Sequence, residues 1–478
     1  MDGTQTTETA PAYVKTALLR YIVPFWIKFA PEYGFADVCK ELDREDMVPV
    51  TVFEPWHHIY EYIITSLTPG SHSAPLGRAW EYRRCELPEG RIGIECPRPK
   101  TPLNHLRIAH ISLVLFTTGV GFLWYEVNCD SNKTGHLRGL KLPELLWLQQ
   151  HLSTAQKETY PILFTQSGTK QTPLEWAGGF LRQQLGDKVC YFENRDLDGM
   201  TVPYRMLHFA DAVIYDENQK PLVTRTCQLA RGFGYASTPG DKLSEQFYNA
   251  FEHTYINIGR EGCAYIADED APPFSRENFL ERFEKCYFWI YLLMLQQSYA
   301  LKLFARRIAQ SASDDPDADT EDTNQLLLEI TAFLVRNEFA SVSDIHHING
   351  FYRYGLEQLN IKEESAVLHD GLDALTQLQN SSRRIQETQR EKKSDERLES
   401  ALALLALLAV ISAVCDSVGI ITGILDESLK GVWWIPVLLM WLLVGGIVYL
   451  AVRLFMGRDL PHIRRRSKVK AQDAEKRD

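Results

Sequence analysis

The sequence predicts an α+β domain that is followed by long helices and ends in a two-helix transmembrane hairpin. Two apolar runs near the C-terminus indicate the hairpin: residues 401–425 carry one charge, Asp416, and residues 431–452 carry none. The segments that are typical of strands all lie within the first 275 residues, so the sheet precedes the helices. No proline occurs between Pro316 and Pro436, which permits helices of unusual length.

Changes in composition divide the chain into five predicted regions. These are a cytoplasmic α/β domain at 1–275, cytoplasmic helices at 276–360, a stalk helix at 361–400, the transmembrane hairpin at 401–456 and a basic cytoplasmic tail at 457–478.

The α/β domain contains one clear β-hairpin. Residues 110–116 and 120–127 are rich in β-branched and aromatic side chains, and Thr117-Thr118-Gly119 joins them. A further helix begins with Thr172-Pro173, a favourable start. In all, we expect helices at 141–152 and 172–185 and strands at 206–215 and 254–267.

The helical region raises the question of a third span. Residues 276–310 have helical character, but the uncharged apolar centre at 286–295 is only ten residues long. Ten residues are too few to cross a bilayer, so we expect a buried helix. An acidic linker at 314–322 follows, and a helix at 324–359 has a candidate break near 341–343.

The stalk is predicted from an apolar repeat at roughly heptad spacing. A continuous helix over 361–425 would be on the order of 100 Å long. Two interpretations are compatible: the stripe packs on the soluble domain, or it bundles with other copies of the chain. The stripe consists of Ile361, Leu368, Leu372, Leu375, Leu378 and Ile385.

The two apolar runs, 401–425 and 431–452, are each long enough to cross a hydrocarbon core of about 30 Å. The connection from Asp426 to Lys430 permits only a tight turn. Lysine and arginine gather before the first run and after the second, which predicts cytoplasmic termini and a plasma (bacterial inner) membrane location. Trp433 and Trp434 are placed as interfacial anchors.

Composition limits the partners and the compartment. The net charge of −11 disfavours nucleic acid as a partner. The nine cysteines include no C-x-x-C pair, which suits reduced thiols in a cytoplasmic domain. The first eleven residues lack an apolar run of signal-peptide type, so we expect the spans to direct insertion into the lipid bilayer.

Four short stretches resemble proteins of the CorA family of divalent-cation channels. They are Thr-Gly-Val-Gly-Phe-Leu at 118–123, Arg-Glu-Gly at 260–262, residues 292–303 with their Gln-Gln pair, and Ile-Ile-Thr-Gly-Ile at 420–424. In that family a cytoplasmic α/β domain leads into long helices, and the longest helix becomes the first of two spans. The resemblance implies a homo-oligomer, with five subunits around one pore.

One departure from the family concerns ion selection. CorA channels carry Gly-Met-Asn after the first span, whereas Gly423 is followed here by Ile424, Leu425, Asp426 and Glu427. The resemblance therefore supports fold and topology more than specificity for Mg²⁺.

Asp416 is the strongest candidate for a pore-lining residue, because a carboxylate within an apolar span is costly and usually faces protein or water. At helical spacing it shares a face of small residues with Ala409, Ser412, Gly419 and Gly423. In an oligomer these residues would line a pore ringed by carboxylates. The alternative is that Asp416 is structural.

Asp426 and Glu427 would stand at the outer mouth of the pore, where acids concentrate cations, or would be solvated turn residues. Asp315, Asp317 and Asp319 begin like an EF-hand loop, but Thr320 and Leu326 occupy the positions that require Gly and Glu. No catalytic motif is recognised, so we expect no enzyme activity and no catalytic residues, and protein ligands for a metal are not identified.

The predicted function is a CorA-like homo-oligomeric channel or transporter that passes a divalent metal cation and is gated by its cytoplasmic domain. No cofactor is expected beyond Mg²⁺ or another divalent cation as the permeant or regulatory ion. The alternative is a membrane effector of a signalling or defence system, whose cytoplasmic domain senses a ligand and opens a membrane pore.

Overall fold

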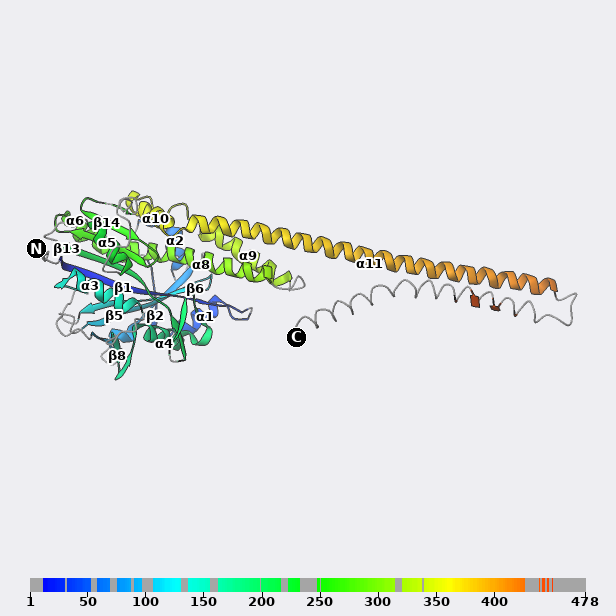
Figure 1. Cartoon of the computed structure of the whole chain (residues 1–478), viewed down its shortest axis with the longest axis horizontal. Coiled ribbons are helices and arrows are strands. Elements are labelled where there is room, and N and C mark those ends of the chain that lie inside the picture. Colours follow the sequence, from blue (N-terminus) through cyan, green and yellow to red (C-terminus); the bar gives the residue numbers. More distant parts are fainter. Residues whose placement is uncertain are drawn as a thin grey trace, which may run out of the picture. The chain divides into compact units, whose positions relative to one another are not determined.

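A computed structural model gives the architecture of the chain (Figure 1). It describes residues 12–425 except 31, 53–57, 69–74, 87–89, 97–105, 130–135, 155–161, 198, 216–221, 233–246, 250, 314–319 and 338. Beyond 425 it describes positions 438, 441, 442, 445, 446 and 449.

The described residues form one large mixed sheet with helices on both faces. Its main path runs β14-β15-β13-β1-β6-β5-β4-β8-β9, and β3 also pairs with β5. The pairing of β13 with β15 is parallel, whereas the other pairings in the sheet are antiparallel. The strands are β1 (Tyr13–Ile27), β2 (Met47–Val50), β3 (Gly77–Tyr82), β4 (Gly93–Glu95), β5 (Leu106–Phe116), β6 (Val120–Cys129), β7 (Leu140–Lys141), β8 (Leu163–Gln166), β9 (Thr169–Gln171), β10 (Val189–Tyr191), β13 (Leu207–Tyr215), β14 (Thr254–Ile258) and β15 (Gly262–Asp268). A separate pair joins β11 (Asn194–Leu197) to β12 (Met200–Pro203).

Strand β1 lies at the centre, between β6 and β13, and both of its faces are buried. Successive side chains of a strand point to opposite faces, so Ile22 enters one hydrophobic core while Tyr21 and Val23 enter the other. A strand of this kind reads as a continuous apolar run, which explains why the segment 13–29 does not show a clear alternation.

Two sets of helices supply the cores on the two faces (Figure 1). One core draws on α1 (Phe35–Leu42), α3 (Leu142–Ser153), α4 (Pro173–Leu185) and α5 (Leu222–Arg231). The other draws on α2 (Glu61–Leu67), α7 (Asn278–Arg282), α8 (Phe288–Ser313), α9 (Thr320–Asn337), α10 (His346–Gln358) and the first turns of α11 (Ile361–Leu425). The short helix α6 (Pro273–Arg276) precedes α7.

Several local predictions are confirmed. The predicted hairpin is β5 and β6, and Gly119 has the positive φ of 84° that the turn between them needs. Helix α4 begins at Pro173 with the Thr172 side chain accepting a hydrogen bond from the Glu175 backbone N–H. Residues 254–267 form the hairpin β14–β15.

The helical region also agrees with the sequence in its main features. The apolar segment 286–295 is buried in the core at the start of α8, as expected of a helix too short to span a bilayer. The break predicted near 341–343 separates α9 from α10. Helix α11 covers Ile361–Leu425, the range predicted for a continuous helix.

The predicted fold class is wrong and needs correction. The structure is a large mixed sheet with helices, and no helix among the residues it describes is both long and apolar enough to cross a membrane. A C-terminal two-helix transmembrane hairpin is therefore not found; most of the second predicted span, 431–452, lies outside the described residues. The physical reason for the error is that an apolar run does not by itself determine its secondary structure or which surface buries it.

The chain divides into two compact units, Met1–Gln377 and Leu378–Asp478. The sheet, both cores and the stripe residues Ile361, Leu368 and Leu375 belong to the first unit. In the second unit, α11 exposes Leu398, Leu402 and other leucines by more than half of their surface.

Candidate functional site

The residues predicted to line a pore lie on α11. Ala409 and Ser412 are exposed. Asp416, Gly419 and Gly423 belong to the same helix, but their side chains lie outside what the structure describes, as do the outer-mouth residues Asp426 and Glu427. The pore predictions therefore stay predictions, and the candidate site comes from another part of the chain.

That part is a row of polar side chains across four neighbouring strands. Arg20 on β1 pairs with Glu126 on β6, which pairs with His110 on β5. Ser112, two residues beyond His110, pairs with Glu81 on β3. Directly paired residues share one face of a sheet, so the five side chains lie on the same face. This face is the one that α8 covers.

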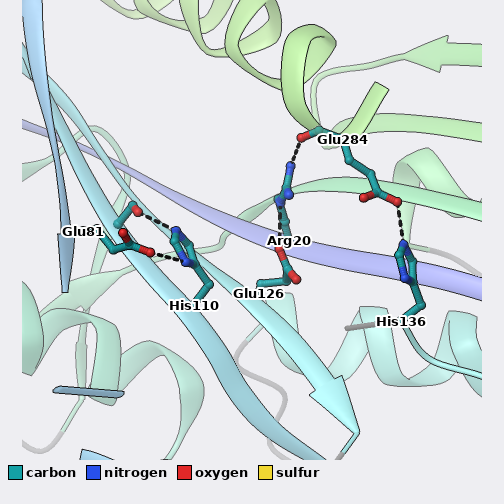
Figure 2. A network of polar contacts seen from close by, with 7 residues as sticks. Arg20, Glu81, His110, Glu126, His136 and Glu284 are labelled. Atoms are coloured by element: carbon teal, nitrogen blue, oxygen red, sulfur yellow. Dashed lines mark hydrogen bonds and ion pairs between the residues drawn. The ribbon is translucent and has the colours of Figure 1, made fainter. Parts of the chain in front are cut away.

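His110 joins two other polar groups of the row. Its Nδ1 lies 2.8 Å from Glu81 Oε1, and its Nε2 lies 2.8 Å from Ser112 Oγ. The imidazole stacks on the indole of Trp124, with ring centroids 4.6 Å apart. The hydrogen bond from His110 lowers the pKa of Glu81, so this carboxyl group is held as a carboxylate. Figure 2 shows the pair beside the Arg20 network.

Arg20 is the centre of a second network (Figure 2). Its Nε donates to Glu126 Oε2 at 3.1 Å, and Nη1 donates to the backbone carbonyl of Glu284. The guanidinium also lies over the rings of Trp124 and Phe288. Glu284 reaches His136, whose Nε2 is 2.6 Å from Glu284 Oε1. Because Arg20 is only 9% exposed, its charge depends on these partners for compensation.

Asp211 adds a buried acid to this region. It lies on β13, opposite Leu18 of β1, and is fully buried. Burial raises the pKa of Asp211 well above its ordinary value, and the negative charge of Glu284 raises it further. Both effects favour the neutral form of the acid, which limits the excess negative charge around Arg20.

A π-helical turn, Phe283–Tyr287, supplies the roof of the site just before α8. Such turns are rare in proteins, and those that do occur are often found at functional sites. Here the turn places Glu284 and Lys285 against the polar row, while Phe283 enters the core and stacks on Phe209 at a centroid distance of 4.6 Å. The turn thus directs Glu284 and Lys285 toward the site while Phe283 stays packed in the core.

These elements line an open pocket of about 220 Å³. It combines charged groups with aromatic walls, as ligand pockets commonly do. The indole N–H of Trp124 is buried and has no hydrogen-bond partner among the described residues, so an acceptor on a ligand would satisfy it. The lining residues are Arg20, Val50, Thr51, Glu81, His110, Ser112, Trp124, Glu284, Lys285, Phe288 and Trp289.

In the part of the chain that the structure describes, no three His, Cys, Asp or Glu side chains come together to hold a metal ion. The charged groups and aromatic walls of the pocket suit an organic ligand with hydrogen-bonding groups and an apolar part.

Sequence reasoning did not single out this pocket. One signal was present: Arg20, His110, Ser112 and Glu126 interrupt strands that are otherwise apolar. Polar residues within buried strands need partners, but the sequence does not say which strands are neighbours.

Comparisons with protein-family models, with curated proteins and with solved structures find no match for this chain.

Proposed function

We propose that the chain is a membrane-associated sensor. In this proposal the sheet domain binds a small organic ligand in the pocket lined by Arg20. Copies of the chain associate through α11, and this assembly produces the response to the ligand. The proposal belongs to the second of the two functions predicted from the sequence, an effector whose folded domain senses a ligand.

One observation carries the link between pocket and response. Phe288, which lines the pocket, lies in the same hydrophobic core as Ile361, Leu368 and Leu375 from the first turns of α11. Close-packed cores transmit displacements instead of absorbing them. A ligand that shifts the start of α8 would therefore bias the start of α11.

The exposed end of α11 supports the self-association. Leu398, Leu402 and Leu405 are exposed by 58%, 58% and 61%, and their spacing places them on one side of the helix. Contiguous apolar surface of this kind marks an interaction site. We infer that copies of this chain cover these three leucines, at the surface of a lipid bilayer.

The transport of a divalent cation stays the rival proposal. Its support is the resemblance of four sequence stretches to CorA-type channels, together with Asp416 in the apolar half of α11. In this reading the assembly would be pentameric, and the sheet domain would gate a cation path. Uptake of Mg²⁺ into liposomes that retain a trapped dye would support a cation transporter, whereas release of the dye would support an effector that opens a non-selective pore.

We expect the triple substitution of Leu398, Leu402 and Leu405 to Gln to reduce an assembly of more than two chains to monomers. The substitution removes the exposed apolar side chains that the copies would share. Mass photometry in nanodiscs measures the change. The control is Val335→Gln with Val367→Gln, two apolar side chains that are exposed by 79% and 66% and lie away from these three leucines. A triple variant that keeps the mass of the wild-type assembly would contradict self-association through α11.

We expect Thr51→Trp to change the output of the assembly while leaving its mass unchanged. Thr51 is exposed at the pocket, so an indole there would fill the ligand space without disturbing the core. The expected change in ion or dye release from liposomes is about fivefold or more, the usual size of coupling between two sites. Thr331→Trp, an exposed threonine of α9 away from the pocket lining, is the control. Equal release by wild type and Thr51→Trp would refute control by this pocket.

A further inference from the structure

Three side chains of the pocket have the arrangement of a nucleophile, a general base and an orienting acid. Ser112 Oγ lies 2.8 Å from His110 Nε2, and His110 Nδ1 lies 2.8 Å from Glu81 Oε1. Both distances are within hydrogen-bonding range. The serine, the imidazole and the carboxylate are therefore connected in the order that an activated serine requires.

The sheet holds the three groups in place. His110 and Ser112 stand two residues apart on one face of β5, and Glu81 is directly opposite Ser112 on β3. A register shift in the pairing with β6 between Ile108 and His110 marks an irregularity beside the imidazole. Irregularities of this type re-aim side chains and occur near active sites. The carboxylate of Glu81 fixes which imidazole nitrogen carries the proton, leaving Nε2 to accept one from Ser112.

A buried donor lies beside the same serine. Trp124 is the β6 partner of Ser112 and is 6% exposed, and its indole N–H has no hydrogen-bond partner within the described residues. Lys285 lines the pocket as well, and its ion pair with Glu281 is exposed and easily exchanged. Donors of both kinds stabilise the negative oxygen that forms when a serine attacks a carbonyl group.

We propose that this pocket hydrolyses small carboxylic esters, with Ser112 as the nucleophile. The aromatic walls formed by Trp124, Phe288 and Trp289 favour a substrate with a planar apolar group on one side of the ester. The activity goes beyond ligand sensing, because it makes the pocket a site that also consumes its ligand.

The reaction balances with water as the second substrate. Ser112 Oγ attacks the ester carbonyl carbon while its proton passes to His110 Nε2, and the carbonyl oxygen becomes negative. The C–O bond to the alcohol then breaks, and His110 returns the proton to the leaving alkoxide. Water, deprotonated by His110, attacks the acyl-serine ester, which releases the carboxylic acid and restores the Ser112 hydroxyl. Glu81 stays ionised and stabilises the imidazolium.

The test uses the full chain with two probes. A fluorophosphonate forms a P–O bond to an activated serine and releases fluoride, so peptide mass spectrometry should find the adduct on Ser112. Hydrolysis of 4-nitrophenyl acetate should be faster than its spontaneous rate and should show saturation. Labelling confined to other residues, or equal labelling of Ser112 in heat-denatured protein, would overturn the proposal.

Variants test the separate roles. Ser112→Ala and His110→Asn should each lower kcat by about 10²–10⁴-fold, and Trp124→Phe, which keeps a ring but removes the N–H, by about 10²-fold with little change in KM. Ser66→Ala on α2 is the control, since the Ser66 hydroxyl donates to the Ile63 carbonyl of its own helix. Undiminished kcat in a folded Ser112→Ala protein would exclude the mechanism. Ester hydrolysis is read without liposomes, so its failure is distinguishable from failure of the sensing and assembly proposed above.

Discussion

Replacing Arg20 by methionine is expected to lower the free energy of unfolding of the folded domain by about 3–5 kcal/mol, because it leaves buried acids without their cation. The side chain of Arg20 is 10% exposed and that of its partner Glu126 is 15% exposed. The same guanidinium also bonds to the backbone carbonyl of Glu284. Chemical denaturation followed by tryptophan fluorescence measures the loss.

Two comparisons separate the buried charge from other effects. The double variant Arg20→Met with Glu126→Gln should recover part of the loss, because it no longer buries an unpaired carboxylate. Lys170→Met breaks the pair with Glu95, whose side chains are 54% and 50% exposed, and should change stability little. An Arg20→Met protein as stable as Lys170→Met would show that the network contributes no stabilisation.

Acidification is expected to destabilise the domain through His208. Burial, together with the positive charge of Arg205, lowers the pKa of His208 to about 3. The unfolded chain takes up a proton near the ordinary pKa of 6.5, whereas the folded chain does not do so until about pH 3. The unfolded state therefore binds more protons in this interval, and stability is lost as the pH falls through it, by about 2 kcal/mol at pH 5.

The control for this prediction is His208→Phe, which keeps an aromatic ring against Tyr21 but cannot titrate. Asp211 contributes a slope of opposite sign, because its raised pKa makes the folded state the better proton binder above its ordinary value of 3.8. Comparing urea denaturation of the two proteins at pH 7.5, 6 and 5 removes that common contribution. Parallel stability curves for wild type and His208→Phe would rule out His208 as the acid-sensitive group.

The sequence alone determined features that depend on neighbouring residues. The β5–β6 hairpin follows from β-branched strands and a glycine at the turn, and Gly119 adopts the positive φ that this requires. Thr172 and Pro173 start α4 because a side-chain cap and a fixed φ satisfy the first turn locally. The continuity of α11 follows equally from a proline-free segment of good helix formers.

The tertiary structure decided everything that depends on which segments meet. Strand β1 brings Arg20 to Glu126 across 106 positions of sequence and to Glu284 across 264, and no periodicity encodes those pairings. What surrounds the apolar end of α11 is likewise not encoded by the local sequence. Hydropathy predicted a membrane hairpin, whereas the described structure contains no helix suited to span a bilayer. The sequence specifies that a buried polar or exposed apolar group must find a partner. Only the packing of the strands and helices specifies which partner it finds.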